Sequence, residues 1–410
     1  MPFDRSQLRS LLACAALAAA TLLAACDDSA TTPPKGLDAP ALAILSSDYK
    51  TSTVSLYDPS TRRLVDDCIA AKDLSKDTVL PSSAQAGELV VVDRDQSMID
   101  FVSPADCLVR GKLSVSTGGF KANPHDIVRV SSTKAYVTRY NKNAAATPAP
   151  GDFDDGDDVL IVDPTGLKVT GRIDLSAQAS TVGGVVLDAR PDRALLANGL
   201  VYVTLNNLSD DFVTAGPGRV AIIDPATDTV KGVVELPGQT GCEGISYDDA
   251  TKHLFVSCGG EFSDADEAAT SALVEIDISG ATPVLGKIVT GKTLGTGMQP
   301  VTYTAAALLG TTAFVGTAGA LDPTSGAMTA PDTLFAVATD TGAGAKVVDG
   351  GAYNLGRPAV DATSMTLFLP DGDPMTPHVR VFDVSGAPAE GTAFEANPTD
   401  HLPPREVAWY

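Results

Sequence analysis

One short pattern recurs along most of the chain: an alternating apolar strand that ends in Asp, Ser or Thr and is followed by a turn. The clear copies are VSLYDPSTRRL (54–64), VLIVDPTGLKV (159–169), VAIIDPATDTV (220–230), LVEIDISGATPV (273–284) and VRVFDVSGAP (379–388), and the weaker ones are IDFVSPADCLV (99–109) and LFAVATDTGAGAKV (334–347). Internal repeats of this length are the sequence signature of solenoids and propellers. The pattern therefore predicts seven similar structural units.

Each turn starts at a side chain that carries an oxygen: Asp58, Ser103, Asp163, Asp224, Asp277, Thr339 and Asp383. Such an oxygen accepts a hydrogen bond from the backbone N–H two residues on and nucleates the turn. A second hairpin lies between successive copies, with inner-strand candidates such as 124–131 and 300–307 and second strands at 134–141, 200–207, 252–258, 311–317 and 365–372. Two hairpins per unit make four strands, the size of a propeller blade, so we predict an all-β, seven-bladed β-propeller.

The two ends of the repeat array complement each other. The first unit, residues 41–69, lacks an inner strand, and the chain ends in REVAWY (405–410), which matches one. The C-terminal strand is therefore expected to complete the first blade and close the ring, which removes exposed sheet edges.

Two tripeptides and two turns carry a family resemblance. Tyr136-Val137-Thr138 and Tyr202-Val203-Thr204, with the turns at 163–166 and 224–227, resemble the YVTN-repeat (YncE-like) β-propeller proteins over nearly all of residues 41–410. The family's Pro-Asp-Gly turn is mostly missing, and the blade spacing is longer and less even. The resemblance implies the architecture and leaves the activity open, because relatives include proteins that bind partners or nucleic acid.

The N-terminus predicts a cellular address. Arg5 and Arg9 precede an uncharged stretch from Leu11 to Ala25 that is of signal-peptide length, and it ends Leu23-Ala24-Ala25-Cys26, which resembles the bacterial lipobox. We expect residues 1–25 to be a lipoprotein signal peptide and Cys26 to carry lipid, including palmitate. The alternative is an ordinary secretory signal with an incidental Cys.

The predicted lipid anchor is followed by a tether and the propeller domain. Residues 26–40 are small, polar and Pro-rich and are expected to form a flexible tether, with the propeller at 41–410. No later stretch has 18 consecutive apolar residues, so no transmembrane helix is predicted. The domain is expected in the cell envelope outside the cytoplasm, anchored through its lipid to the inner or the outer membrane.

The charge of the chain narrows its partners. There are 51 acidic against 29 basic residues, a net charge of −22. Nucleic-acid binding depends on Lys and Arg neutralising phosphates, so we expect none. The excess of acid indicates solubility, or alternatively cation binding.

Four cysteines remain after Cys26, and export permits disulfides. Cys242 and Cys258 each lie eight residues from Ala250, so a hairpin that closes there sets them opposite each other within disulfide range. Cys68 and Cys107 then pair by elimination and link the first two blades. No pair has the short spacing of a metal site.

Four insertions follow the second strands, at 141–157, 206–218, 259–271 and 318–331, and the topology places all of them on one rim. An acidic run, Asp152, Asp154, Asp155, Asp157 and Asp158, closes the first insertion and extends one residue past it, and the third contains Asp264, Asp266 and Glu267. Alternating Asp and Gly can supply oxygen ligands to Ca²⁺, so this run is a candidate calcium site. A solvated acidic loop is the other interpretation.

The mouth of the central channel is the second candidate place. Starts of inner strands bring His125, Asp126, Glu243, Gln299, Arg357, Arg405 and Glu406 toward it. Propeller enzymes that resemble gluconolactonases hold a metal there. A ring of ion pairs that plugs the channel explains the same residues.

No catalytic motif forces an enzyme interpretation, and we assign no catalytic residue. We expect a membrane-tethered binding or scaffold module whose loop-rich acidic rim contacts a protein or a small molecule. The alternative is a metal-dependent, lactonase-like hydrolase, with Ca²⁺ as the metal, whose site is the channel mouth.

Overall fold

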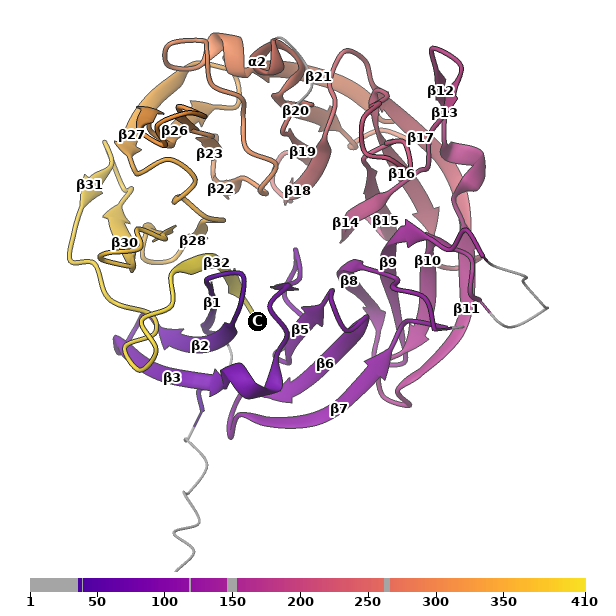
Figure 1. Cartoon of the computed structure of the whole chain (residues 1–410), viewed down its shortest axis with the longest axis horizontal. Helices are drawn as coiled ribbons and strands as arrows, with labels where there is room; N and C mark the ends of the chain where they lie inside the picture. The colour runs from indigo at the N-terminus through magenta and orange to yellow at the C-terminus, as the bar shows by residue number, and fades with distance from the viewer. Residues whose placement is uncertain (1–35, 39, 118, 146–152, 262–265) are drawn as a thin grey trace, which may run out of the picture. The chain divides into compact units, whose positions relative to one another are not determined.

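The computed structural model describes residues 36–38, 40–117, 119–145, 153–261 and 266–410. These residues form a ring of seven four-stranded antiparallel sheets around a central axis (Figure 1), which confirms the predicted seven-bladed propeller. The predicted signal peptide and Cys26 lie outside the described residues, and so does Asp264. None of the described helices is long or apolar enough to cross a membrane; the α-helix α2 (Glu267–Thr270) has four residues.

The blades are numbered along the chain, and their strands are given from the axis outward. Blades one to three are β32 (Pro404–Trp409), β1 (Leu42–Ser47), β2 (Ser52–Asp58), β3 (Arg63–Ile69); β4 (Thr78–Val79), β5 (Leu89–Asp93), β6 (Met98–Ser103), β7 (Leu108–Ser114); and β8 (Pro124–Ser131), β9 (Lys134–Lys142), β10 (Gly156–Asp163), β11 (Lys168–Asp174). Blade four is β14 (Pro191–Ala197), β15 (Leu200–Leu205), β16 (Gly218–Asp224), β17 (Thr229–Leu236).

Blades five to seven are β18 (Cys242–Asp248), β19 (His253–Cys258), β20 (Ala272–Asp277), β21 (Val284–Thr290); β22 (Ala307–Leu309), β23 (Thr312–Thr317), β26 (Thr333–Ala338), β27 (Gly344–Asp349); and β28 (Ala359–Asp361), β29 (Thr366–Asp371), β30 (His378–Asp383), β31 (Ala389–Glu390). Two small hairpins lie outside the blades: β12 (Thr181–Val182) with β13 (Val185–Val186), and β24 (Ala320–Leu321) with β25 (Met328–Ala330). Short 3₁₀ turns occupy Ala71–Asp73, Ser176–Gln178 and Gly291–Thr293.

The last strand closes the ring as predicted. β32 pairs antiparallel with β1, in the register Leu42–Trp409, Ala43–Ala408 and Ile44–Val407. Blade one therefore takes three strands from the start of the domain and one from its end.

The predicted turn chemistry holds at the five Asp positions. The carboxylate of Asp58 accepts a hydrogen bond from the N–H of Ser60 at 2.9 Å, and Asp163, Asp224, Asp277 and Asp383 accept the equivalent bond at 2.8–3.0 Å. The two weaker copies differ: Ser103 bonds the Asp106 side chain, and the Thr339 hydroxyl donates to the carbonyl of Thr311.

Packing between blades explains the sequence pattern of the strands. Both faces of a middle strand meet a neighbouring blade, so the run Leu89–Val92 of β5 is buried throughout. One core cluster joins Val92 and Phe101 of blade two to Val137 and Leu160 of blade three. Outer strands such as β7 lose this cover, and in β7 only Leu113 is buried.

Two boundaries differ from the predictions. The inner strand expected at 300–307 is reduced to β22, because the carbonyls of Tyr303 and Ala306 accept hydrogen bonds from Gly244 and Ser246 of blade five. The end of the expected tether is docked: the N–H groups of Gly36 and Leu37 donate to Ala105 and Pro104, so the folded domain begins before residue 41.

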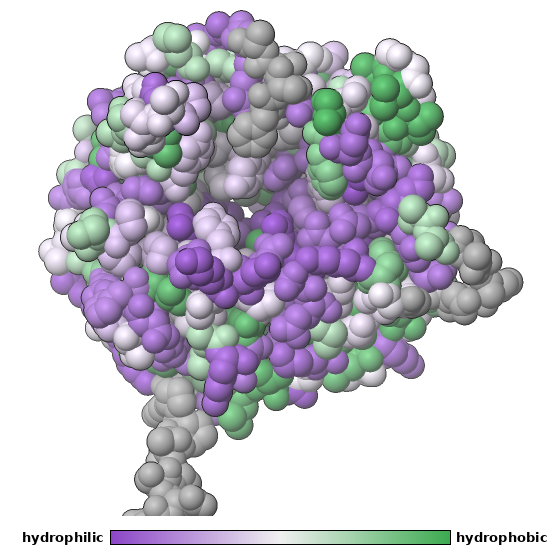
Figure 2. Space-filling model, viewed as in Figure 1, coloured by the Kyte–Doolittle hydropathy of each residue, from purple (hydrophilic) through white to green (hydrophobic). Residues whose placement is uncertain are grey.

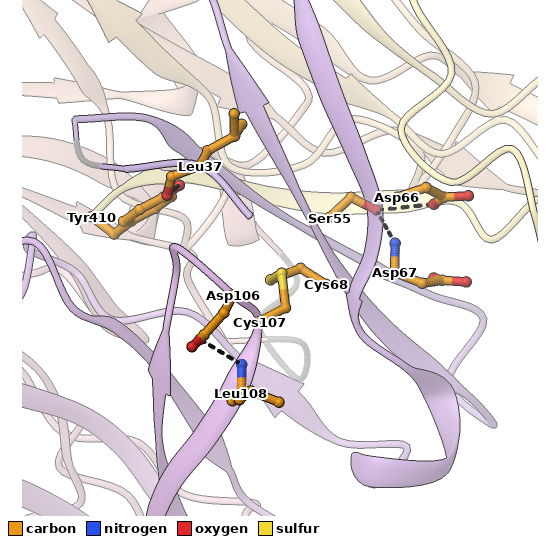
Figure 3. Close-up of a disulfide and its surroundings, with 9 residues drawn as sticks. All are labelled: Leu37, Ser55, Asp66, Asp67, Cys68, Asp106, Cys107, Leu108 and Tyr410. Atoms are coloured by element: carbon orange, nitrogen blue, oxygen red, sulfur yellow. Dashed lines mark hydrogen bonds between the residues drawn. A yellow bond between two sulfur atoms is a disulfide. The ribbon is translucent and has the colours of Figure 1, made fainter. Parts of the chain in front are cut away.

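Both predicted disulfides are present. Cys242 and Cys258 are directly opposite each other on β18 and β19. Cys68 of β3 bonds Cys107 in the β6–β7 turn, with Cα atoms 5.0 Å apart, and so joins blades one and two (Figure 3). Leu37 and Tyr410 lie nearby, and the Tyr410 hydroxyl donates to the Leu37 carbonyl at 3.1 Å.

Removing the inter-blade disulfide tests its contribution to stability. Because the bond spans 39 residues, C68A/C107A is expected to lower the free energy of unfolding by about 3–4 kcal/mol, mainly by freeing the unfolded chain. Urea denaturation measures this. Reductant should destabilise the wild type more than this variant, which retains only Cys242–Cys258; equal losses would contradict the assignment.

Candidate functional site

Charged side chains gather where the inner strands begin. Strands β8, β14 and β18 carry His125, Asp192 and Glu243 near their first residues, and β32 carries Glu406. Inner strands all run in the same direction along the axis, so their starts lie together at one mouth of the channel. Figure 2 shows the centre of the ring as a hollow bordered by hydrophilic residues.

A buried imidazole–carboxylate pair lies at this mouth. Nδ1 of His125 is 2.7 Å from Oδ2 of Asp192, and the imidazole ring stacks on Tyr140 with centroids 4.3 Å apart. The other ring nitrogen, Nε2, is buried and has no hydrogen-bond partner among the described residues. Asp192 thus holds one edge of the His125 ring and Tyr140 covers one face, while Nε2 makes no hydrogen bond to the described residues.

The protonation of the pair follows from its surroundings. Burial lowers the pKa of His125, which favours the neutral ring. Burial alone would raise the pKa of Asp192, but the hydrogen bond with His125 and the charges of Arg193 and Arg94 bring it below its usual value. A neutral imidazole that donates from Nδ1 to an ionised Asp192 leaves a lone pair on Nε2, the arrangement of a general base.

Glu243 is the complementary group. Its Oε1 accepts a hydrogen bond from the Asn206 amide at 2.9 Å, and the same amide reaches the Tyr140 hydroxyl at 3.1 Å. Burial, with the nearby charge of Asp192, raises the pKa of Glu243 to about 8. Near neutral pH this carboxyl holds a proton. Neighbouring titratable groups whose pKa values are pushed apart are the pattern of an acid and a base.

Arginines supply positive charge to the same place. Arg193 lies 3.5 Å from both Asp192 and Glu406, and its NH1 donates to the Leu80 carbonyl at 2.9 Å. Arg94 is held by Asp77 at 2.8 Å, and its charge acts on His125, Asp192 and Glu243. Cations at these positions can stabilise an oxyanion.

Part of the predicted set is an ion-pair network. Arg357 donates to the carbonyls of Leu80 and Pro81 at 3.3 and 3.0 Å and lies 3.5 Å from Glu406, which accepts from the Leu80 N–H at 3.0 Å. This network holds β32 to the segment that follows β4. Arg357 and Glu406 therefore fit the interpretation of these residues as ion pairs that plug the channel.

Asp126 also has a structural role. Its carboxylate accepts hydrogen bonds from the N–H groups of Ser82, Ile127 and Ala194 at 2.8–3.0 Å, which joins blades two, three and four. Burial raises its pKa despite these bonds.

Two predicted residues lie away from the cluster. The amide of Gln299 donates to Ala318 and Pro331 in the insertion of blade six. Arg405 donates to the Ser47 carbonyl at 3.0 Å and lies over the ring of Tyr49. Five residues of this cluster were not predicted from the sequence: Asp192, Arg193, Arg94, Tyr140 and Asn206. The only signal for the first two was their place at the start of an inner strand.

A cavity of about 390 Å³ occupies the channel beside Arg357. Its apolar walls include Leu195, Ile245, Leu308, Val360, Val407 and Trp409. The channel thus combines a charged region with an apolar one.

The acidic run in the first insertion is tied to arginines and backbone. Asp158 is bonded by Arg139 through two contacts of 2.7 Å and by Arg172 at 2.9 Å, and Asp155 pairs with Arg172 at 2.7 Å. The carboxylate of Asp157 accepts hydrogen bonds from the backbone N–H groups of Ala189 and Arg190. Its pKa rises to about 6 through burial.

These contacts bear on the calcium hypothesis. Asp152 lies outside the described residues, and Asp154 has one buried oxygen without a hydrogen-bond partner. Within the described ranges no group of three or more His, Cys, Asp or Glu side chains is arranged to hold a metal ion. The geometry of Asp154–Asp158 gives calcium no support, and the hypothesis stays a prediction.

No family model matches the chain, and no curated protein matches it. Similar structures include a 6-phosphogluconolactonase candidate from Bacteroides uniformis (TM-score 0.57, 12% identity, 90% of this chain and 99% of that one) and the Pseudomonas aeruginosa periplasmic gluconolactonase PpgL (0.54, 10%, 90% and 98%). The β-propeller domain of Myceliophteria thermophila Cps50 (Swd1) is also similar (0.54, 11%, 85% and 99%). At these identities the likeness establishes the fold, and membership of the YVTN-repeat family stays a prediction.

The raised pKa of Glu243 predicts a pH dependence of stability. Between its ordinary pKa of 4.5 and about 8 the folded protein holds a proton that the unfolded chain releases. The free energy of unfolding must therefore fall as the pH rises through this window. E243Q cannot titrate there, so the urea midpoint of the wild type should fall relative to that of E243Q from pH 5 to 8.

A matched variant isolates the effect. Glu235 is an exposed carboxylate on the outer strand β17. E235Q should follow the wild type at every pH. Parallel curves for wild type and E243Q would show that burial of Glu243 does not favour its protonated form.

Proposed function

We propose that the protein is a hydrolase that opens cyclic esters (lactones) at the channel mouth by acid–base catalysis. The observation that carries the proposal is the His125–Asp192 pair with its unused Nε2, close to a carboxyl whose pKa is raised to about 8. A base and an acid that are both in the required state near neutral pH suit hydrolysis of an ester.

The residues support a balanced reaction. Nε2 of His125 takes a proton from water as the water oxygen attacks the lactone carbonyl carbon, and Asp192 stabilises the imidazolium. Arg193 and Arg94 supply positive charge for the oxyanion. The ring C–O bond then breaks as Glu243 protonates the departing oxygen. The product is a hydroxy acid, and the proton on His125 returns through water to Glu243.

The fold comparisons are compatible with this substrate class. Two of the similar structures are described as a gluconolactonase and a 6-phosphogluconolactonase candidate. Each step is assigned to a side chain of the protein. The polar side chains at the mouth contact one another, and among the described residues no three of them are arranged to bind a metal ion.

Removal of either group tests the proposal. H125A and E243Q are each expected to lower kcat/KM for δ-gluconolactone by about 10²–10⁴, the usual loss for a general base or acid. D192N should also lower it, since the ring loses its orienting partner. A pH-indicator assay measures acid release.

The pH profile adds an independent check. The wild-type kcat/KM should fall above pH about 8, where Glu243 loses its proton. E235Q serves as the control and should match the wild type. Absence of turnover with aldonolactones and simple γ- and δ-lactones, or full turnover by H125A, would overturn the proposal.

A second candidate function is binding of a protein partner by the rim. Loops between second and third strands, and between blades, emerge on one face, and they carry most of the exposed large apolar residues: Tyr49, Val185, Val186, Phe212, Val213, Met298, Tyr303, Leu321, Met328, Tyr353 and Met375. Exposed apolar side chains gathered on one face are typical of interaction sites. Lipid on Cys26 would hold this face within the cell envelope, as the lipobox predicts.

Charge introduced into the rim tests this candidate. Val186 and Met375 are 71% and 86% exposed; Val186 belongs to the small β12–β13 hairpin between blades three and four, and Met375 lies in the β29–β30 loop of the rim. V186D/M375D should abolish cross-linking to envelope proteins without loss of fold. V284D is the control, because Val284 is exposed at the opposite face, in the β20–β21 region. Equal cross-linking by all three proteins would exclude the rim.

A further inference from the structure

A pocket of about 250 Å³ opens beside the candidate site, on the rim side of blades three and four. It is lined by Phe120, Lys121, Asn141, Lys142, Asn143, Arg190, Asp210 and Phe212. Three basic side chains in one pocket stand out in a chain of net charge −22.

Arg190 is buried but poorly satisfied. Its side chain is 2% exposed, yet Nε has no hydrogen-bond partner among the described residues. Its other contacts are long: the carbonyls of Tyr140 and Ser209 at 3.4 and 3.5 Å, and the carboxylates of Asp210 and Asp188 at 3.4 and 3.5 Å. Good N–H···O bonds are 2.7–3.2 Å.

Arg139, on β9 of the neighbouring blade three, provides the comparison. It is equally buried, and its guanidinium makes contacts of 2.7 Å with Asp158 and with the Phe153 carbonyl, as well as contacts of 3.1 and 3.2 Å with Thr117 and Val115. Arg139 is thus a satisfied structural arginine. A guanidinium has five N–H donors, so Arg190 has capacity for another hydrogen-bond acceptor. Leaving a buried donor without an acceptor lowers the stability of the fold.

Aromatic rings hold this guanidinium beside the pocket. It lies 5.3 Å from the ring centre of Tyr140 and 4.7 Å from that of Phe212, and the two rings are nearly parallel. Tyr140 also stacks on His125. A single aromatic residue therefore contacts both the arginine of the pocket and the proposed general base.

Asp210 shows what the pocket accepts. Its side chain is 86% exposed and places a carboxylate oxygen 3.4 Å from NH2 of Arg190. The lysines are engaged elsewhere, Lys142 by Asp188 at 3.0 Å and Lys121 by Asp95. The Arg190 guanidinium is the group of the pocket that is left with the weakest contacts.

We infer that this pocket binds the anionic group, a carboxylate or a phosphate, of the molecule on which the His125–Asp192 pair acts. The anion replaces the Asp210 carboxylate on Arg190, and Phe120 and Phe212 flank it. The assignment to the substrate rests on the proposed function, whereas anion binding by the pocket is tested separately.

Binding is measured first, without turnover. Calorimetric titration of the purified protein with inorganic phosphate and with benzoate should give millimolar or tighter binding of at least one, and the two titrations distinguish phosphate from carboxylate. D210N removes the competing carboxylate and should tighten binding about three- to tenfold. R190Q should abolish it, and K231Q, which removes an exposed charge on β17, should not change it.

R190Q could lose binding simply because it misfolds. The tighter anion binding expected of D210N cannot be explained in that way, so the inference can be tested with D210N as well. No binding of either anion by wild type and D210N, or unchanged binding by R190Q, overturns the inference.

Kinetics then test the link to the substrate. The KM ratio of γ-butyrolactone to its γ-carboxy derivative should fall at least tenfold in R190Q relative to wild type and K231Q. An unchanged ratio overturns the assignment to the substrate. Anion binding without any lactone turnover would mean that the proposed function has failed while the pocket stands.

Discussion

The pairing of β32 with β1 is the contact on which the other arrangements depend. It joins the two ends of the domain and closes seven blades into a ring, so that every blade has a neighbouring blade on both sides. The same strand carries Glu406, which bonds the Leu80 N–H and lies 3.5 Å from Arg193 and Arg357. Closure thus also sets the charges at the mouth of the channel.

Buried polar groups divide into those that build the ring and those with unused capacity. Asp126 and Arg139 are saturated with short hydrogen bonds between blades or loops, and such groups hold the fold together. His125 and Arg190 are as deeply buried but keep nitrogen atoms without partners. An unsatisfied buried group costs stability, and these two residues, on either side of Tyr140, are the ones to which we assign the proposed functions.

The repeat architecture was predictable because each of its determinants is local. An Asp that accepts the N–H two residues on makes a turn wherever it occurs, and a hairpin centred on Ala250 sets Cys242 opposite Cys258. Most of the proposed site was not predictable in this way. Gln299 and Arg405 begin inner strands or the segments before them, yet they turn to carbonyls of the rim, while Asp192 and Asn206 complete the site without any motif.

By itself the sequence determined the seven blades and the Cys242–Cys258 disulfide, since strand alternation, turn chemistry and close Cys spacing act over a few residues. The closing strand and the Cys68–Cys107 disulfide then followed by elimination, as the strand and the cysteines that were left without a partner. Only the tertiary structure decided which polar side chains meet at the channel. That outcome depends on the direction in which each side chain leaves its strand and on which neighbour satisfies it first, and both are set by contacts between residues that are far apart in the chain. The imidazole of His125 finds Asp192 67 residues away, and Arg190 finds no strong partner at all among the described residues.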